Sequence, residues 1–258
     1  MNRELFKNKV LNDIYCQLLP DDVTVNTMTI ICDTNIQFNI KNISSYIDTS
    51  FIHKKKVKKI KKNKKSFFNQ VTLCVMVESK KEKPVNLKLF SNGSMQMTGC
   101  KTIDNALDTL EKMFSELRKV KGVLDKKTLK IVDKPFCDNI DCLNYGAIKN
   151  IRVEMIVSKF TYPCKINRPL LFELLIKEQI ECKYDPELHA SVDLKILFDE
   201  KKISVFIFEK GSIVITGARN CKQIEHAYNF INTFLLKNHK VISKKNLGQN
   251  DIEKYLEV

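Results

Sequence analysis

The sequence contains one internal repeat: LFSNGSMQMTGCK, residues 89–101, returns as IFEKGSIVITGAR, residues 207–219. Identical residues recur at a constant spacing of 118: Phe90, Gly93, Ser94, Thr98 and Gly99 match Phe208, Gly211, Ser212, Thr216 and Gly217. A duplication of this kind predicts two copies of one supersecondary unit. The chain is therefore expected to fold as two related halves.

Both copies predict the same order of elements. Alternating residues form a strand, a Gly-Ser turn reverses the chain, a second strand ends at Thr-Gly, and an amphipathic helix follows. Thr102 and Asn220 precede the two helices as expected N-caps. The apolar positions with helical spacing are Ile103, Ala106, Leu107, Leu110, Met113, Phe114 and Leu117 in the first helix, and Ile224, Ala227, Tyr228, Ile231, Phe234 and Leu235 in the second.

Upstream of the motif, each half opens with a strand beside an asparagine, Asn26 or Asn150, and leads towards a short helix. The second short helix begins at Arg168 and Pro169. Its expected wide apolar face comprises Leu170, Leu171, Leu174, Leu175 and Ile180. We expect helices to cover one face of each half-sheet and to leave the other face for solvent or a ligand.

The expected domain boundaries follow the repeat. The first repeat is expected at 23–120 and the second at 148–237, with a linker or insert at 121–147 between them. A helical extension at 1–22 precedes the repeats, and a C-terminal extension at 238–258, with a short helix around 251–256, follows them. No apolar run approaches the roughly 18 to 20 residues of a membrane span, and no secretory signal is recognisable, so we expect an intracellular protein. The nine cysteines are spread singly, which predicts reduced thiols that fill the core.

The chain is strongly basic, with 44 basic and 30 acidic side chains and a net charge of +14. Such an excess predicts a polyanionic partner. Nine lysines lie between residues 54 and 65, and removing them leaves +5. By itself this run is equally typical of a solvated loop or a nuclear-localisation signal. Its members are Lys54, Lys55, Lys56, Lys58, Lys59, Lys61, Lys62, Lys64 and Lys65.

Nothing in the sequence predicts catalysis. The four histidines, His53, His189, His226 and His239, fall in unrelated contexts, and glycine-rich phosphate loops and paired metal ligands are absent. Cys137 and Cys142 form the closest cysteine pair, but a second pair that would complete a zinc site is missing. We expect no enzyme activity, cofactor, metal, small-molecule substrate or membrane association.

The duplicated motif, together with IKNI at 148–151 and YDPELH at 184–189, resembles the TATA-box-binding protein family over roughly residues 23–237. The long inserts and lysine-rich usage resemble the versions encoded by large nucleocytoplasmic DNA viruses. The resemblance implies an α+β fold of two tandem pseudo-symmetric repeats that form a saddle, with a curved antiparallel sheet on the concave face and helices on the convex face. It implies a transcription initiation factor that binds AT-rich promoter double-stranded DNA through the minor groove, in a host nucleus or a cytoplasmic viral replication site, with packaging in the virion as a further option.

The resemblance also assigns groove-facing residues. Phe90 and Phe208 are the expected wedges between base steps, with Phe68, or Phe67 in an alternative frame, as the partner of Phe90. The expected hydrogen-bonding residues near the centre are Asn26, Asn150, Thr98 and Thr216. Taken singly, such residues are more often caps, turns or core, and it is their pairing across the repeat that favours a DNA contact. Phe206 and Val214 keep the apolar character of this face.

The chain departs from the family where His189 replaces a stirrup phenylalanine and where Lys88, Gln96 and Arg152 replace apolar residues. Cationic groups gain from phosphates and narrow grooves rather than from excluding water. We therefore expect weaker sequence preference and less DNA bending than in the cellular relatives.

The lysine run falls in the first stirrup, where we expect it to contact phosphates. Further phosphate candidates, with solvated surface residues as the alternative, are Lys101, Lys195, Lys210 and Arg219. In the family the second stirrup docks transcription factor IIB, and Asp185, Glu187 and Leu188 match the positions used, so a factor IIB-like partner and viral RNA polymerase machinery are implied. The rival hypothesis is a scaffold or nonspecific nucleic-acid-binding module of the same fold that has lost TATA-specific bending.

Overall fold

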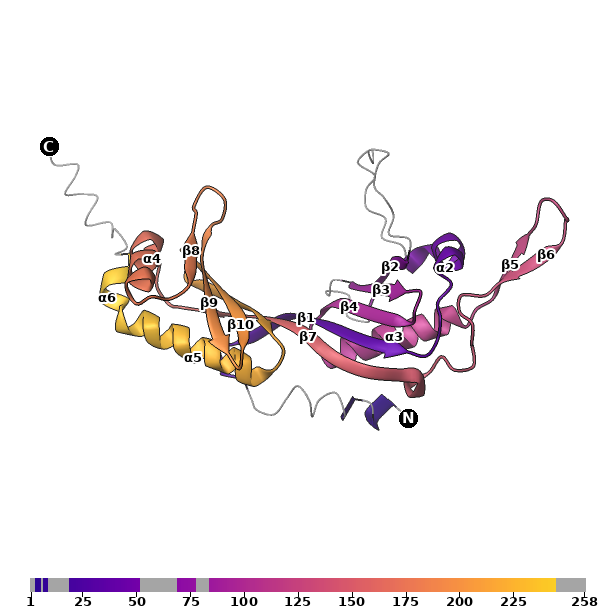
Figure 1. Ribbon diagram of the computed structural model, residues 1–258, viewed down its shortest axis with the longest axis horizontal. Helices are drawn as coiled ribbons and strands as arrows, with labels where there is room; N and C mark the ends of the chain where they lie inside the picture. The colour runs from indigo at the N-terminus through magenta and orange to yellow at the C-terminus, as the bar shows by residue number, and fades with distance from the viewer. Residues whose placement is uncertain (1–2, 6, 9–18, 52–68, 78–83, 245–258) are drawn as a thin grey trace. The chain divides into compact units, whose positions relative to one another are not determined.

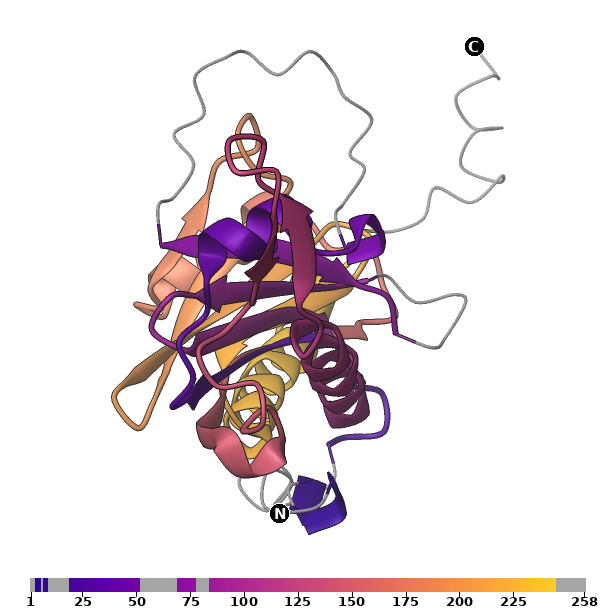
Figure 2. The ribbon, with the colours of Figure 1, turned by 90° about the vertical axis from the view of Figure 1, so that its right-hand side faces the viewer.

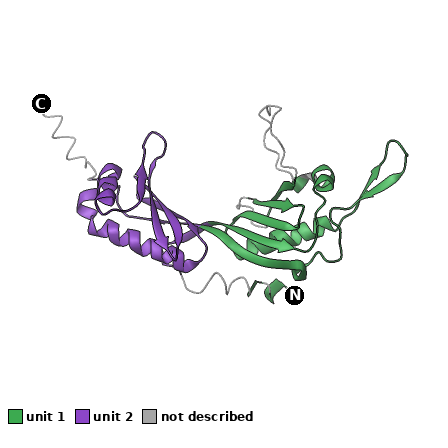
Figure 3. Ribbon diagram, viewed as in Figure 1, with its two compact units in different colours: residues 1–16, 27–156 green, residues 17–26, 157–258 purple. Residues whose placement is uncertain are grey.

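The computed structural model describes residues 3–5, 7–8, 19–51, 69–77 and 84–244, and Figure 1 labels its helices and strands. The chain divides into two compact units (Figure 3): unit 1 comprises residues 1–16 and 27–156, and unit 2 comprises residues 17–26 and 157–258. Each unit combines antiparallel strands with helices. Among the described residues, no helix is both long enough and apolar enough to cross a bilayer.

The strands of unit 1 follow the order β2-β3-β4-β1-β7. Their bounds are β1 Thr24–Thr34, β2 Gln70–Val75, β3 Val85–Phe90, β4 Ser94–Cys100 and β7 Ile148–Thr161. The long helix α3, Ile103–Leu117, packs against β2, β3 and β4, as Figure 2 shows, while the shorter α2, Ile40–Tyr46, and the single turn η1, Thr49–Phe51, lie beside β2. Helices therefore cover one face of this sheet.

The strands of unit 2 follow the order β7-β11-β10-β9-β8. Their bounds are β8 Cys182–Tyr184, β9 Ser191–Phe198, β10 Lys201–Phe208 and β11 Ser212–Ala218. The long helix α5, Cys221–Lys237, packs against β9, β10 and β11, and α4, Arg168–Lys177, packs against β8, β9 and the short α6, His239–Ile242. The order of elements predicted for the two halves is confirmed.

The compact units do not coincide with the sequence repeats. Residues 24–26 of β1 belong to unit 2, and residues 148–156 of β7 belong to unit 1. A linear division at residues 23 and 148 therefore describes the order of the copies along the chain and not the grouping of contacts in space.

Local signals placed the turns and helix starts correctly. Gly93 and Gly211 have positive φ angles of 91° and 83°, and a Cβ at either would come within 2.4 or 2.1 Å of a backbone carbonyl oxygen. Thr102 caps α3 by accepting from the amide of Asn105 at 3.2 Å, and Asn220 caps α5 by accepting from the amide of Gln223 at 3.0 Å. The predicted turn glycines and N-caps are confirmed.

The predicted wide apolar face of the second short helix is confirmed in part. Helix α4 begins at Arg168 as expected, with Asn167 as its cap, but within it only Leu171 and Leu175 are buried. Leu170 and Leu174 are half-buried, and Ile180 lies beyond the helix. Among the described residues α4 packs mainly against β8, β9 and α6, and it is most buried at Leu171 and Leu175.

The segment expected to be a linker contains a β-hairpin. Strands β5, Lys121–Leu124, and β6, Ile131–Lys134, pair antiparallel, and the turn η2, Tyr145–Ala147, follows. The side chains of Leu124 and Ile131 are 57% and 75% exposed. Since these apolar residues do not face a core, the alternation that usually reveals a strand was missing from the sequence.

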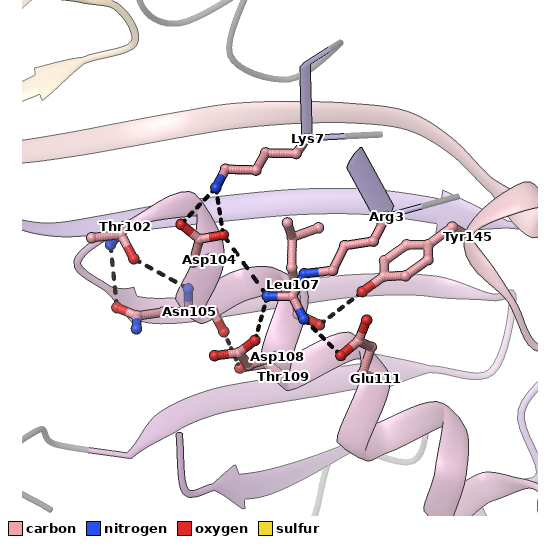
Figure 4. Close-up of polar contacts among 10 residues, drawn as sticks. All are labelled: Arg3, Lys7, Thr102, Asp104, Asn105, Leu107, Asp108, Thr109, Glu111 and Tyr145. Carbon is pink, nitrogen blue, oxygen red and sulfur yellow. Dashed lines mark hydrogen bonds and ion pairs between the residues drawn. The ribbon is translucent and has the colours of Figure 1, made fainter. Parts of the chain in front are cut away.

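Arg3 and Lys7 of the N-terminal extension lie beside the acidic side chains of α3 (Figure 4). Residues 3–5 and 7–8 are helical, as predicted, whereas residues 19–22 are not. The Arg3 guanidinium lies 2.6 Å from Asp108 and 2.7 Å from Glu111, and the Lys7 ammonium lies 2.9 Å from Asp104. These pairs compensate the carboxylates of α3. The helix expected around 251–256 lies outside the described residues.

The cysteines of the described residues are free thiols, as predicted, and most fill the core. Cys32, Cys74, Cys100, Cys137 and Cys221 are buried, whereas Cys142 is exposed. Burial raises the pKa of the Cys32 and Cys100 thiols to about 12, which leaves them protonated and unreactive.

Candidate nucleic-acid interface

Strand alternation gives each sheet a face covered by helices and a face opposite them, here called the open face. In unit 1, Leu87, Leu89, Met95 and Met97 are buried on the covered side. Residues between them point the other way, because successive side chains of a strand alternate and directly paired residues share a face. In unit 2 the covered side likewise carries buried residues, namely Ile203, Val205, Ile207, Ile213 and Ile215.

Cross-strand pairing arranges the open face in rows. The turn row pairs Phe90 with Gln70 in unit 1, and Phe208 with Ser191 in unit 2. The middle row is Ile31, Gln96, Lys88 and Thr72 in unit 1, and Val214, Phe206, Asp193 and Lys183 in unit 2. The Thr-Gly row is Thr29, Thr98, Asn86 and Cys74 in unit 1, and Thr216, Ser204 and Lys195 in unit 2.

Nine of the predicted contact residues therefore lie on open faces. They are Phe90, Lys88, Gln96 and Thr98 in unit 1, and Phe208, Phe206, Val214, Thr216 and Lys195 in unit 2. All are half-buried except the exposed Lys195, which hydrogen-bonds to Ser204 across the strand pair. The register assumed from alternation agrees with the structure at each of these positions.

The two phenylalanines that are predicted as wedges occupy matched positions. Phe90 and Phe208 end strands β3 and β10, and the backbone carbonyl of each accepts a hydrogen bond at 3.0 Å from the turn glycine three residues later. The glycine carbonyls in turn accept from Thr34 in unit 1, at 3.0 Å, and from Tyr162 in unit 2, at 2.8 Å. Each phenylalanine is thus held beside a turn that is itself fixed by the neighbouring strand.

The two asparagines are less well matched than the sequence suggests. Thr34 and Tyr162 are equivalent, since each donates to its turn glycine, but Asn26 precedes Thr34 by eight residues and Asn150 precedes Tyr162 by twelve. Asn150 also has a positive φ of 48°, a conformation that asparagine tolerates better than most residues. Both side chains are exposed near the start of their strands.

Arg152, predicted to face the groove, is compensated by carboxylates of its own unit. Its guanidinium lies 3.5 Å from Glu154 and 3.9 Å from Asp33, and its side chain is 53% exposed. Asp33 also accepts a hydrogen bond from the Ser94 hydroxyl at 2.8 Å on the open face. Exposed ion pairs contribute little to stability, so Arg152 can exchange these partners for phosphates at small cost.

The remaining predicted cations lie away from the sheet centre. Lys101 and Arg219 follow the Thr-Gly ends of β4 and β11, and Lys210 lies in the β10–β11 turn; all three are exposed. The lysine run at 54–65 and Phe67 and Phe68 lie outside the described residues, so their predicted contacts remain predictions.

The predicted partner site is an exposed turn between β8 and β9. The Asp185 carboxylate accepts from the amides of Glu187 at 3.1 Å and Leu188 at 3.3 Å, so it shapes the turn. The Leu188 side chain is 79% exposed, and Glu187 and His189 are exposed as well. Glu187 and Leu188 are therefore presented by the turn, whereas Asp185 is partly engaged in holding it.

Arg168 links this turn to Glu209, the residue after Phe208, and this link was not predicted from the sequence. Its guanidinium donates to the carbonyl of Ala190 and, at 3.0 Å, to the Glu209 carboxylate beside Phe208, and it lies 5.7 Å from the Tyr184 ring centroid. Lys244 adds a 2.8 Å bond to Glu209. Lys244 foremost, and Arg168 with it, lower the pKa of Glu209. In the sequence Arg168 is recognisable only as the start of a helix.

Two carboxylates on the open faces were not predicted from the sequence. Asp33 lies opposite Ser94 in unit 1, and Asp193 lies between Phe206 and Lys183 in unit 2 and accepts from the Ser191 hydroxyl. Strand alternation was the available signal, since Asp33 is in phase with Ile31. Within the described residues, no cluster of three or more histidine, cysteine or carboxylate side chains could hold a metal ion.

The chain is similar to TATA-binding proteins in the sequence of its second repeat and in its fold. Residues 150–238 match the family model described as transcription factor TFIID, or TATA-binding protein. The structure is similar to that of the Methanococcus jannaschii TATA-binding protein, with a TM-score of 0.51 at 16% identity over 81% of this chain and 95% of that chain. This likeness confirms the predicted fold class.

Two sequence relatives extend the similarity beyond the second repeat. A TATA-box-binding protein-like chain of Acanthamoeba polyphaga mimivirus is 34% identical over 217 residues, which cover 77% of this chain and 57% of the relative. TATA-box-binding protein 2 of Haloferax volcanii is 30% identical over 139 residues, which cover 54% of this chain and 61% of the relative. The chain thus spans about three fifths of the length of either relative.

Proposed function

This chain is TATA-box-binding-protein-like in fold and sequence, and we propose that it binds AT-rich promoter DNA through the minor groove and acts as a transcription initiation factor. The observation that carries the proposal is the matched placement of Phe90 and Phe208, one at the turn end of each open face. Apolar wedges at the ends of a sheet can enter base steps and kink a duplex. We propose that the chain binds DNA and does not itself catalyse a reaction.

The open faces offer groups suited to the minor groove. Each Thr-Gly row carries hydroxyl groups, among them those of Thr98 and Thr216, and A·T pairs present only acceptors in that groove. Phe206 and Val214 add an apolar patch in unit 2. Together, hydrogen-bond donors and apolar side chains favour A·T over G·C pairs, but they do not distinguish A·T from T·A.

The grip on DNA relies more on phosphates than an apolar sheet would. Lys88 and Gln96 occupy the middle row of unit 1, and the lysine run adds nine charges outside the described residues. Phosphate contacts strengthen binding but carry no sequence information. We therefore propose modest sequence preference and modest bending.

Competition between duplexes tests this function. A labelled AT-rich duplex bound to the full chain near physiological salt is displaced by unlabelled AT-rich or GC-rich duplex of equal length. The proposal requires the AT-rich competitor to be more effective. Equal displacement by both duplexes would identify a nonspecific binder instead.

A factor IIB-like protein is the partner we propose for the turn at 185–189. Glu187 and Leu188 combine an acidic group and an exposed apolar side chain, which suits a partner surface with basic and apolar residues. Because carboxylates repel DNA phosphates, we assign this turn to a protein partner and the open faces, with their phenylalanines and cations, to DNA. Viral RNA polymerase machinery would then be recruited through that partner.

The second candidate function is a scaffold of the same fold that does not bind DNA specifically. The observation that favours it is the presence of Asp33 and Asp193 on the open faces, because carboxylates repel phosphates. The competition experiment separates the two candidate functions, because a scaffold that does not bind DNA would leave the labelled duplex free even before any competitor is added.

A further inference from the structure

We propose that Gln96 lets the open face of unit 1 accept a G·C pair in the minor groove, while Val214 at the matched position makes unit 2 reject one. The chain would then read an asymmetric site, A·T-restricted under unit 2 and G·C-tolerant under unit 1. This inference rests on the proposed function, because it requires DNA against both open faces.

The two positions correspond through the repeat and through the sheets. Gln96 and Val214 lie 118 residues apart, and each is the third residue of the strand that follows its turn. Gln96 is paired with Lys88 and Val214 with Phe206, and these partners are also 118 residues apart. The middle rows thus differ in chemistry at equivalent points of two similar frameworks.

The minor groove distinguishes base pairs mainly by the guanine 2-amino group. A·T and T·A pairs present only acceptors there, whereas a G·C pair adds this donor. A glutamine amide supplies an acceptor oxygen for the donor, together with N–H groups for the neighbouring acceptors. Valine offers neither, so a 2-amino group pressed against it loses its water without gaining a partner.

The surroundings strengthen the contrast. A serine, Ser94 or Ser212, flanks both positions along the strand, but in unit 1 the Ser94 hydroxyl donates to the Asp33 carboxylate, so further acceptor oxygens lie in the adjoining pair. In unit 2, Val214 is flanked across the strands by Phe206, which is half-buried and apolar. A guanine amino group placed against Gln96 therefore meets an amide oxygen, whereas one placed against Val214 meets carbon atoms, since Asp193 of the same row lies beyond Phe206.

Inosine provides the decisive probe, because I·C lacks only the 2-amino group of G·C. Starting from an AT-rich duplex, a single G·C or I·C pair is placed at each position in turn, and the affinity of the full chain is measured by fluorescence anisotropy. In one half of the site, G·C should cost about tenfold in affinity and I·C should restore it. In the other half, G·C and I·C should both bind within about threefold of the parent.

Two reciprocal exchanges assign the halves to the units. Gln96→Val should raise the G·C penalty of the tolerant half to about tenfold, and Val214→Gln should lower that of the other half to about threefold. Each exchange installs the residue that the matched strand already carries, and thermal melting checks that the variant is folded. Should either variant fail to fold, the G·C and I·C comparison on the unaltered chain still decides whether the two halves differ.

The outcomes separate this inference from the function on which it rests. Equal G·C penalties in both halves, or a Gln96→Val variant whose tolerant half is unchanged, would overturn the asymmetric reading while AT-selective binding stands. Absence of binding to the AT-rich parent would contradict the proposed function and this inference together.

Discussion

Phe90 and Phe208 hold the same position in the two units: each ends the strand before the turn, and its carbonyl accepts from Gly93 or Gly211 at 3.0 Å. The glycines are required there, since any Cβ would collide with a backbone carbonyl oxygen. The repeat has thus preserved both the aromatic side chain and the turn that orients it.

Removing one wedge should weaken and straighten the complex. Phe208→Ala is expected to lower the affinity for an AT-rich duplex by about tenfold and to reduce its bend, because the side chain no longer enters a base step. Anisotropy and fluorescence transfer between the duplex ends measure the two effects. Phe230→Ala is the control, since Phe230 lies on α5, the covered side of the same unit, and is 37% exposed. Equal losses in both variants would contradict a wedge role.

Neutralising the lysine run should flatten the salt dependence of binding. If all nine lysines at 54–65 are replaced by glutamine, the slope of log affinity against log salt should fall by about 0.9 for each phosphate no longer neutralised. Affinity measured across a salt series gives the slope. A variant with the original slope would show that the run serves targeting rather than DNA contact.

Acidification should remove the stabilising effect of the Glu209 contacts. Lys244 foremost, and also Arg168, lower the pKa of Glu209 below its ordinary value of 4.5. A lowered folded-state pKa stabilises the protein above the ordinary value, and this effect is lost as the pH falls below 4.5 through the folded pKa. Glu209→Gln should therefore melt earlier than the unaltered chain near neutral pH.

The difference in melting temperature between the two proteins should shrink as the pH falls below 4.5. Glu173→Gln, on the exposed side of α4, provides the matched carboxylate control. A Glu209→Gln difference that persisted unchanged at acid pH would show that the ion pairs with Lys244 and Arg168 are not its source.

Charge reversal at the exposed turn should disrupt partner binding without affecting DNA. Glu187→Arg is expected to abolish retention of a factor IIB-like protein on the DNA-bound chain, because a basic partner surface would then face a cation. Asp185 is a poorer target, since its carboxylate holds the turn. Glu173→Arg makes the same charge change elsewhere in unit 2. Retention of the partner by Glu187→Arg would refute the proposed docking site.

Turns and caps could be predicted because their chemistry is local. The positive φ angles of Gly93 and Gly211 and the capping side chains of Thr102 and Asn220 depend on neighbours within a few residues. The placement of Gln96 and Phe206 on open faces likewise follows from strand period alone.

Other features depend on contacts between residues far apart in the sequence and could not be predicted from it. Arg168 joins Ala190, Glu209 and Tyr184 only after folding. The hairpin of β5 and β6 exposes its apolar side chains, so its sequence lacks the alternation of apolar and polar residues that indicates a half-buried strand. The unequal spacing of Asn26 and Asn150 from their turns becomes visible only through the hydrogen bonds of Thr34 and Tyr162.

The central claim, that the open faces bind the minor groove, is tested most directly by a duplex in which every A·T pair of the bound site is replaced by I·C. This replacement keeps the A·T pattern of the minor groove and presents the G·C pattern in the major groove. We predict that the full chain binds the I·C duplex within about threefold of the A·T duplex and more tightly than the G·C duplex. An I·C duplex bound as weakly as the G·C duplex, with the A·T duplex bound tightly, would place recognition in the major groove and contradict the account.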